Sequence, residues 1–155
     1  MNPNSEAEFQ KEMLTLLEET FVRHHGVYTD KGTSFFETLA GIDSKKASRV
    51  LPGLNESIAG HVFHTGFYID VLIEYVTGKR KGKTDWDASW RIKTVNDDEW
   101  EKLVLSLKEQ YAVLQRFVQA DENLKTEDFL GGALGILAHC AYHLGAVRQL
   151  MDINV

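Results

Sequence analysis

The chain has 155 residues, 43% of them hydrophobic and 26% charged, as is typical of one globular domain with a sizeable core. We therefore expect a single domain over residues 1–155. The formal net charge of −6 and the lack of a long Lys/Arg run argue against a nucleic-acid partner. The single cysteine, Cys140, excludes an internal disulfide and indicates a cytoplasmic protein. Export and membrane insertion are not expected, because the N-terminus is acidic and no stretch approaches 18 uninterrupted apolar residues.

A first helix is predicted from Ser5 to about Arg23, where apolar residues recur at helical spacing. Ser5 can open it with a capping box. His24 and His25 would fall in its last turn, where a histidine interacts favourably with the helix dipole. A long connection with one or two short helices is then predicted over residues 27–53. This connection can cover one end of a bundle.

A second helix is predicted from about Ser57 to Thr77, with Gly78 as its terminator. It carries His61 and His64, which are three residues apart and therefore differ by about 60° around the helix axis. Both rings can lean towards the same side of the helix, and we expect at least one to face the core.

Residues 79–96 show no helical period and carry Trp86 and Trp90. Fully extended, such a segment spans about 60 Å, about twice the length of the second helix. It can therefore cross the whole molecule, with its tryptophans holding it down. A third helix would then start at Asn96, a capping residue followed by acidic residues, and run parallel to the second.

After a polar turn at Asp121–Asp128, a fourth helix is predicted within Gly131–Asp152. It places His139 and His143 at positions i and i+4, so both rings can address one ion. On an apolar face, two histidines are either hydrogen-bonded within the core or hold a metal there. The HxxxH spacing alone does not decide between these interpretations.

Four long amphipathic helices and one long crossover predict an all-α fold, a four-helix bundle of up-down-down-up topology. The crossover connects helices two and three. Interior metal sites are a known use of this fold, and a third ligand would come from the second helix, as His61 or His64. Three neutral imidazoles suit a divalent transition metal, with zinc as the default and nickel or iron as alternatives.

Several landmarks also match a known family: Ser57-Ile58-Ala59-Gly60-His61-Val62-Phe63-His64, the Trp-bearing crossover, Trp100, and His139-Cys140-Ala141-Tyr142-His143-Leu144-Gly145-Ala146-Val147-Arg148-Gln149. Over nearly its full length the chain resembles the DinB/YfiT-like family of small helical bundles, which includes metal-dependent thiol transferases. The resemblance implies a metal site of His64, His139 and His143. His61 departs from the family pattern and remains the alternative third ligand.

The resemblance implies that a small thiol, activated as a thiolate by the metal, is transferred to an electrophilic substrate. Two other functions keep the same residues: a metal-assisted hydrolase using metal-bound water, and a non-catalytic metal or small-ligand binding protein of the stress response. Measurement of substrate turnover would distinguish these three functions. The resemblance also implies a small-molecule substrate, a low-molecular-weight thiol as co-substrate, and a homodimer.

Three further side chains are candidates for contact with a substrate: Tyr68, Tyr142 and Arg148. Aromatic residues at helical spacing are also common in cores, which is the alternative for the two tyrosines. Cys140 follows His139 by one residue and points about 100° away, so we interpret it as a small buried side chain. No nucleophile from the protein itself is expected.

Overall fold

The structure is a computed structural model that describes residues 3–120 and 127–153. Within these ranges all regular structure is helical, which confirms the predicted all-α class. The four long helices are α1 (Pro3–Phe21), α4 (Ile58–Val76), α5 (Asp97–Gln119) and α6 (Glu127–Asp152). The short ones are α2 (Phe35–Leu39), α3 (Ser44–Ala47) and the 3-10 helix η1 (Asp87–Trp90).

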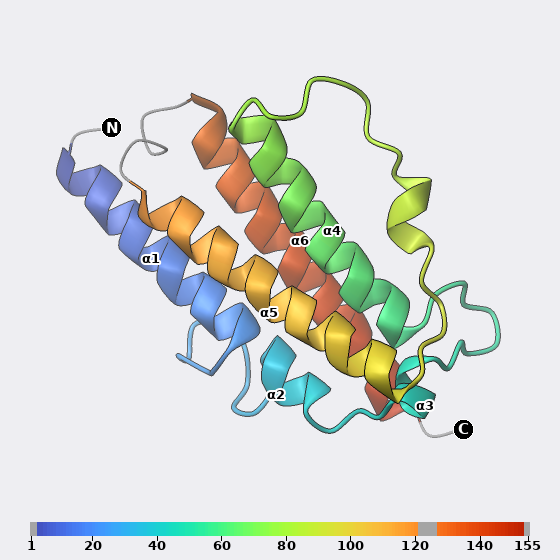
Figure 1. The fold of residues 1–155 in the computed structure, drawn as a ribbon. Helices are drawn as coiled ribbons and strands as arrows, with labels where there is room; N and C mark the ends of the chain where they lie inside the picture. Colours follow the sequence, from blue (N-terminus) through green and yellow to red (C-terminus); the bar gives the residue numbers. More distant parts are fainter. Residues whose placement is uncertain (1–2, 121–126, 154–155) are drawn as a thin grey trace.

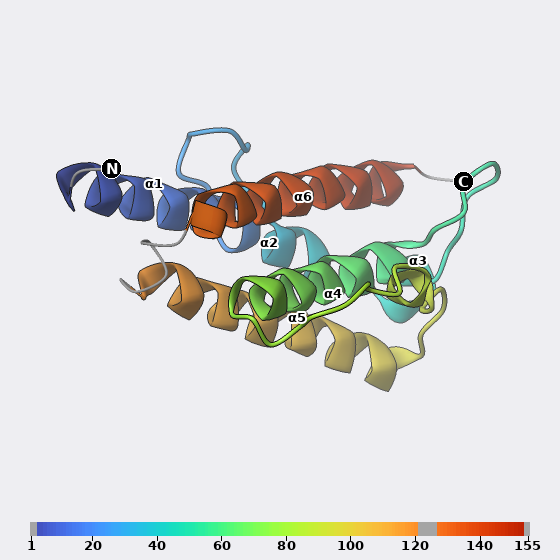
Figure 2. The same ribbon diagram turned by 90° about the horizontal axis from the view of Figure 1, so that it is seen from above.

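The four long helices lie side by side, with α4 and α5 running in one direction and α1 and α6 in the other (Figure 1). Seen from above, α1 and α6 form one layer and α4 and α5 the other (Figure 2). Gln110, in the middle of α5, donates to Asp70 in the middle of α4 at 2.7 Å, in keeping with their parallel course. The core takes apolar side chains from all four, among them Leu17, Ile69, Leu114 and Ile136.

The ends of α4 and the start of α5 follow the predicted capping residues. Ser57 precedes α4 and accepts a hydrogen bond from the backbone N–H of Gly60 at 3.1 Å. After α4, Gly78 adopts a φ of +69°, a conformation that favours glycine. Asn96 precedes α5 and accepts from the N–H of Glu99 at 2.9 Å, completing a capping box.

The predicted ends of the first helix are wrong. The helix begins at Pro3, so Ser5 lies inside it and does not cap it; proline is tolerated in a first helical turn because its missing N–H is not needed there. It ends at Phe21, so His24 and His25 follow the helix and do not form its last turn.

Glu19, a buried carboxylate of α1, explains where the chain turns away from the helix. It accepts hydrogen bonds from the backbone N–H groups of His25 at 3.3 Å, Val27 at 3.0 Å and Thr29 at 3.3 Å. Burial alone would raise the pKa of Glu19, but these hydrogen bonds outweigh it and hold the pKa at about 2. An ionised side chain therefore anchors the connection from inside.

Two other predictions need correction. The fourth helix starts at Glu127, within the predicted turn, because Phe129 is buried and packs on Phe117 with ring centroids 5.6 Å apart. Residues 121–126 of that turn lie outside the described residues. The crossover is not wholly irregular, since η1 forms where the Asp85 side chain accepts from the N–H of Asp87 at 3.1 Å.

Helix α6 is long and carries no charged residue between Phe129 and Val147. From Phe129 to Asp152 its length and composition would suffice for a membrane span. This is weak evidence, because the core helix of a soluble protein meets the same criterion. Here α6 packs on α4 and α1 along its length.

Candidate metal centre

Three histidines from two helices meet in the interior. His64 comes from α4, while His139 and His143 come from successive turns of α6. One ring nitrogen from each lies within 4.8 Å of the other two, and the group can hold a metal ion. His64 and His143 are buried and His139 is half-buried. Among the described residues this group takes His64, and not His61, as the partner of the HxxxH pair.

The orientation of His64 is set by the crossover. Its Nδ1 lies 2.7 Å from Ser89 Oγ, and that hydroxyl donates its only proton to the carbonyl of Trp86 at 2.5 Å. Ser89 Oγ must therefore accept from His64 Nδ1–H. The ring is held with its proton on Nδ1 and with Nε2 free to bind an ion. Trp90 stacks on the same ring at a centroid distance of 3.9 Å.

The surroundings of His139 indicate whether these residues fit a metal ion. Its Nε2 is buried and has no hydrogen-bond partner. A buried nitrogen left unsatisfied costs about 1–3 kcal/mol, so such atoms call for an explanation. The ring cannot easily turn to another partner, since Tyr68 stacks on it with centroids 3.6 Å apart and planes 12° apart. A bound cation would satisfy this nitrogen, and the three imidazoles fit one.

His143 has a fourth histidine beside it. His61 Nδ1 lies 2.9 Å from His143 Nδ1, within hydrogen-bonding distance. His61 is half-buried, and its ring meets Trp90 edge-on at 5.4 Å. It therefore contacts a member of the group without belonging to it.

The site favours neutral imidazoles, the form that binds metals. Burial lowers the pKa of His64 and of His139 to about 4, and a neighbouring imidazole, His61 and His64 respectively, adds to the effect. Burial, with repulsion from the three other rings, lowers the pKa of His143 to about 2. The pKa of His61 is also lowered, chiefly by burial. At neutral pH all four imidazoles are therefore neutral. Each carries one proton, so its other ring nitrogen keeps a lone pair that can bind a metal or accept a hydrogen bond.

The three candidates for substrate contact fall in different places. Tyr68 stacks on His139, and burial raises the pKa of its phenol, so it stays protonated. Tyr142 meets the ring of His143 at 4.9 Å and is 70% exposed. Arg148 is not brought to the histidines by any described contact. It donates to the hydroxyl of Thr38 at 3.3 Å and lines a separate cavity of about 200 Å³.

Cys140 is fully buried, and its burial raises the pKa of the thiol. Both facts agree with the interpretation of this residue as a small core side chain. Sequence reasoning missed Ser89, because a single serine in an irregular segment carries no signal of its own. Its position between Trp86 and Trp90, the two aromatic residues expected to hold the crossover down, is the only hint that the sequence offers.

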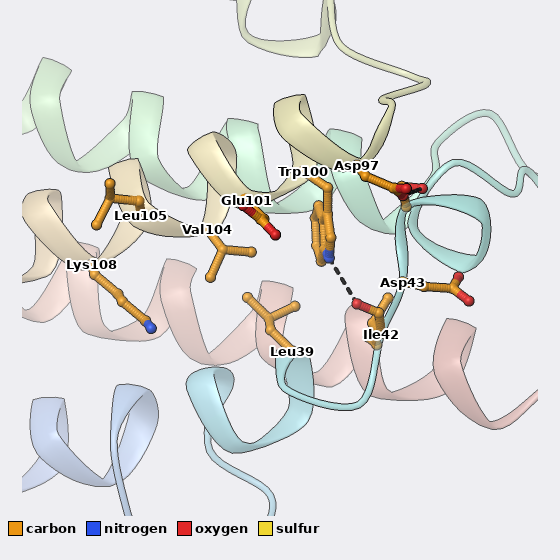
Figure 3. Close-up of a pocket in the computed structure, with 10 residues that line it drawn as sticks. Leu39, Ile42, Asp43, Asp97, Trp100, Glu101, Val104, Leu105 and Lys108 are labelled. Atoms are coloured by element: carbon orange, nitrogen blue, oxygen red, sulfur yellow. Dashed lines mark hydrogen bonds between the residues drawn. The ribbon is translucent and has the colours of Figure 1, made fainter.

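A larger cavity, of about 460 Å³, lies elsewhere, between the α2–α3 segment and α5 (Figure 3). Leu39, Ile42 and Val104 contribute to its apolar lining, and Trp100 donates from Nε1 to the carbonyl of Ile42 at 2.8 Å. None of the histidines lines it. This cavity is therefore separate from the cluster of metal-ligating groups.

Comparisons of the chain with protein-family models, with curated proteins and with solved structures found no match. Function is therefore inferred from the geometry of the histidine site and from the sequence motifs.

Proposed function

We propose that this chain is a metal-dependent enzyme of the DinB/YfiT-like type, in which His64, His139 and His143 hold one divalent transition metal, zinc by default. The observation that carries the proposal is the buried, unpartnered Nε2 of His139 within a group of three imidazoles. Such a nitrogen is unfavourable without an ion and useful with one.

The fold supports the same assignment. We propose a four-helix bundle of up-down-down-up topology, because the four long helices have that order of directions and the crossover joins the two parallel ones (Figure 1). The two histidine-bearing helices, α4 and α6, are antiparallel neighbours. Ligands from facing helices are how such bundles build interior metal sites.

The activity we propose is transfer of a small thiol to an electrophilic substrate: the thiol releases its proton, the thiolate forms a sulfur–carbon bond, and the bond from that carbon to a leaving group breaks, with the leaving group taking the electron pair. Three protein ligands leave a coordination position open, where a bound ion would lower the pKa of a thiol and so supply a nucleophile at neutral pH. The chain contributes orientation: Ser89 fixes the His64 ring, while Trp90 and Tyr68 cover the faces of two of the imidazoles.

The test begins with the metal. Protein purified without a metal-affinity tag is expected to contain about one transition-metal ion per chain by elemental analysis. His64→Ala, His139→Ala and His143→Ala should each lose it. His24→Ala is the matched control, because His24 lies outside the site, near Glu19. Absence of metal in the parent under all loading conditions would refute the proposal.

Activity then separates the three functions. Loaded protein is incubated with low-molecular-weight thiols and a panel of electrophiles, and thiol consumption is followed. Metal-dependent consumption that is lost in His139→Ala supports the transferase. Hydrolysis of esters or amides without thiol consumption would replace it by a hydrolase. Bound metal with neither reaction would leave a binding protein.

We also propose that the chain is a cytoplasmic homodimer that pairs through α6. From Phe129 to Val147 this helix has no Asp, Glu, Lys or Arg, yet Leu134 is 47% exposed and Tyr142 is 70% exposed. An uncharged apolar face is complementary to itself across a two-fold axis. Sedimentation should give a dimer for the parent and a monomer for Leu134→Glu; a monomeric parent at high concentration would refute pairing.

A further inference from the structure

We infer that His61 is a positioning residue for His143: it accepts a hydrogen bond from His143 Nδ1–H and thereby leaves His143 Nε2 as the metal ligand. This inference rests on the proposed metal site and goes beyond it, because it assigns a role to a fourth histidine. The contact is direct, since the two Nδ1 atoms are 2.9 Å apart. In a hydrogen bond between two neutral imidazoles, one Nδ1 carries the proton and the other accepts it.

The rest of the cluster decides the direction of this hydrogen bond. His64 has Nδ1 committed to Ser89, so it offers Nε2 to an ion. His139 has a buried Nε2 without a partner, so it also offers Nε2. His143 has Nδ1 committed to His61, and only its Nε2 remains. A neutral ring that binds through Nε2 carries its proton on Nδ1, so His143 is the donor and His61 the acceptor.

His61 is itself poorly placed to be a ligand. Its Nδ1 is used in the contact with His143, and the ring is not part of the group whose nitrogens lie within 4.8 Å of one another. Trp90 meets the ring edge-on at 90°, which restricts its rotation. The alternative of His61 as third ligand would require breaking the contact with His143.

A carboxylate supports His61 as an acceptor. The negative charge of Glu56 acts on His61, and Glu56 Oε2 is buried without a hydrogen-bond partner. When His61 shares the proton of His143, partial positive charge develops on its ring, and a nearby carboxylate stabilises that charge. His64 and His143 would thus each have an outer partner, Ser89 for one and His61 for the other.

The experiment compares two substitutions of His61. His61→Asn keeps an oxygen acceptor near the position of Nδ1, whereas His61→Leu has similar bulk and no acceptor. We expect Zn²⁺ affinity, measured by competition with a chelator, to fall about 10- to 100-fold for His61→Leu and to stay within about threefold of the parent for His61→Asn. Both should still bind one ion per chain. His25→Leu, at the surface, is the control.

Two results of the binding measurement would overturn the inference. Equal losses in the Asn and Leu variants would mean that the acceptor does not matter. Loss of stoichiometric binding in both variants, as in His64→Ala, would make His61 a ligand.

The second readout needs no metal. Two-dimensional NMR of the ¹⁵N-labelled apo protein reports which ring nitrogen of His143 carries the proton. We expect Nδ1–H in the parent and in His61→Asn, and a mixture of tautomers in His61→Leu. An Nε2–H form in the parent would overturn the inference even if metal binds normally. A parent that binds no metal would refute the proposed function, and the tautomer would then decide the role of His61 by itself.

Discussion

Trp90 lies flat against His64, with ring centroids 3.9 Å apart and planes 12° apart. The preceding residue, Ser89, accepts a hydrogen bond from the same imidazole. Two consecutive residues of the crossover thus fix the plane and the tautomer of one candidate ligand. The crossover is therefore part of the site as well as a connection between two parallel helices.

The first prediction concerns Ser89. Ser89→Ala removes the acceptor of His64 Nδ1–H and frees the ring to change tautomer, so Zn²⁺ affinity should fall about 10- to 100-fold. Ser48→Ala is the matched control, because Ser48 also anchors the crossover, through the backbone of Val95, without touching a histidine. Chelator competition measures both. Equal losses would mean that the crossover acts by general anchoring.

The second prediction concerns pH. In the unfolded chain the histidines titrate near their ordinary pKa of 6.5, but folding lowers the pKa of His64 and His139 to about 4 and that of His143 to about 2. Below pH 6.5 the unfolded state therefore binds more protons than the folded state. The stability of the metal-free protein should be full above pH 6.5 and should fall, by about 1.4 kcal/mol per pH unit for each histidine, towards pH 4.

Urea denaturation of the metal-free protein at pH 7.5, 6 and 5 tests this. His143→Leu should show a smaller loss over the same range, because one buried histidine no longer has to be protonated on unfolding. Leu105→Ala, at an exposed position without a titratable group, should keep the full dependence. A stability that is flat between pH 7.5 and 5 would contradict the burial of the cluster.

Much of the fold was predictable because its signals are local. Ser57, Asn96 and Gly78 mark helix ends through their own backbone and side-chain preferences, and the structure places the ends of α4 and the start of α5 there. The C-terminal end of α1 was missed because Glu19, which binds backbone N–H groups of the following loop, has the same appearance in sequence as any surface glutamate.

The candidate site was likewise predictable only where its signals are local. The pair His139 and His143 follows from helical spacing, while the choice of His64 over His61 came from a resemblance and agrees with the group that the structure brings together. The partners Ser89 and His61 depend on how the crossover and α6 lie against α4. Such tertiary contacts leave no periodic trace, so spacing could not predict them.

The third prediction concerns Glu19. Glu19→Gln replaces a charged acceptor by an amide that directs N–H groups at the backbone N–H groups of residues 25–29, so we expect a loss of about 2–4 kcal/mol in the free energy of unfolding. Glu12→Gln, at the surface, should change it by less than about 0.5 kcal/mol. Chemical denaturation at pH 7 measures both. A Glu19 variant as stable as the Glu12 control would contradict the anchoring role.

The last prediction concerns the contact between the parallel helices α4 and α5. A Cβ added at Gly66 would lie 1.9 Å from Gln110 Oε1, so Gly66→Ala must displace the Gln110 side chain and break its hydrogen bond to Asp70. That loss, about 1 kcal/mol, should cancel the gain of about 1 kcal/mol that alanine brings over glycine within a helix. The Gln110→Ala background lacks the three atoms that lie nearest to the added Cβ, so there Gly66→Ala should stabilise by about 1 kcal/mol. Gly145→Ala is the control: it has open space around it and should stabilise equally in both backgrounds. Urea denaturation of the parent, the two single variants and the double variant measures how the effect of Gly66→Ala on the free energy of unfolding depends on residue 110. An effect that is the same in both backgrounds would rule out the alignment of α4 and α5 described above.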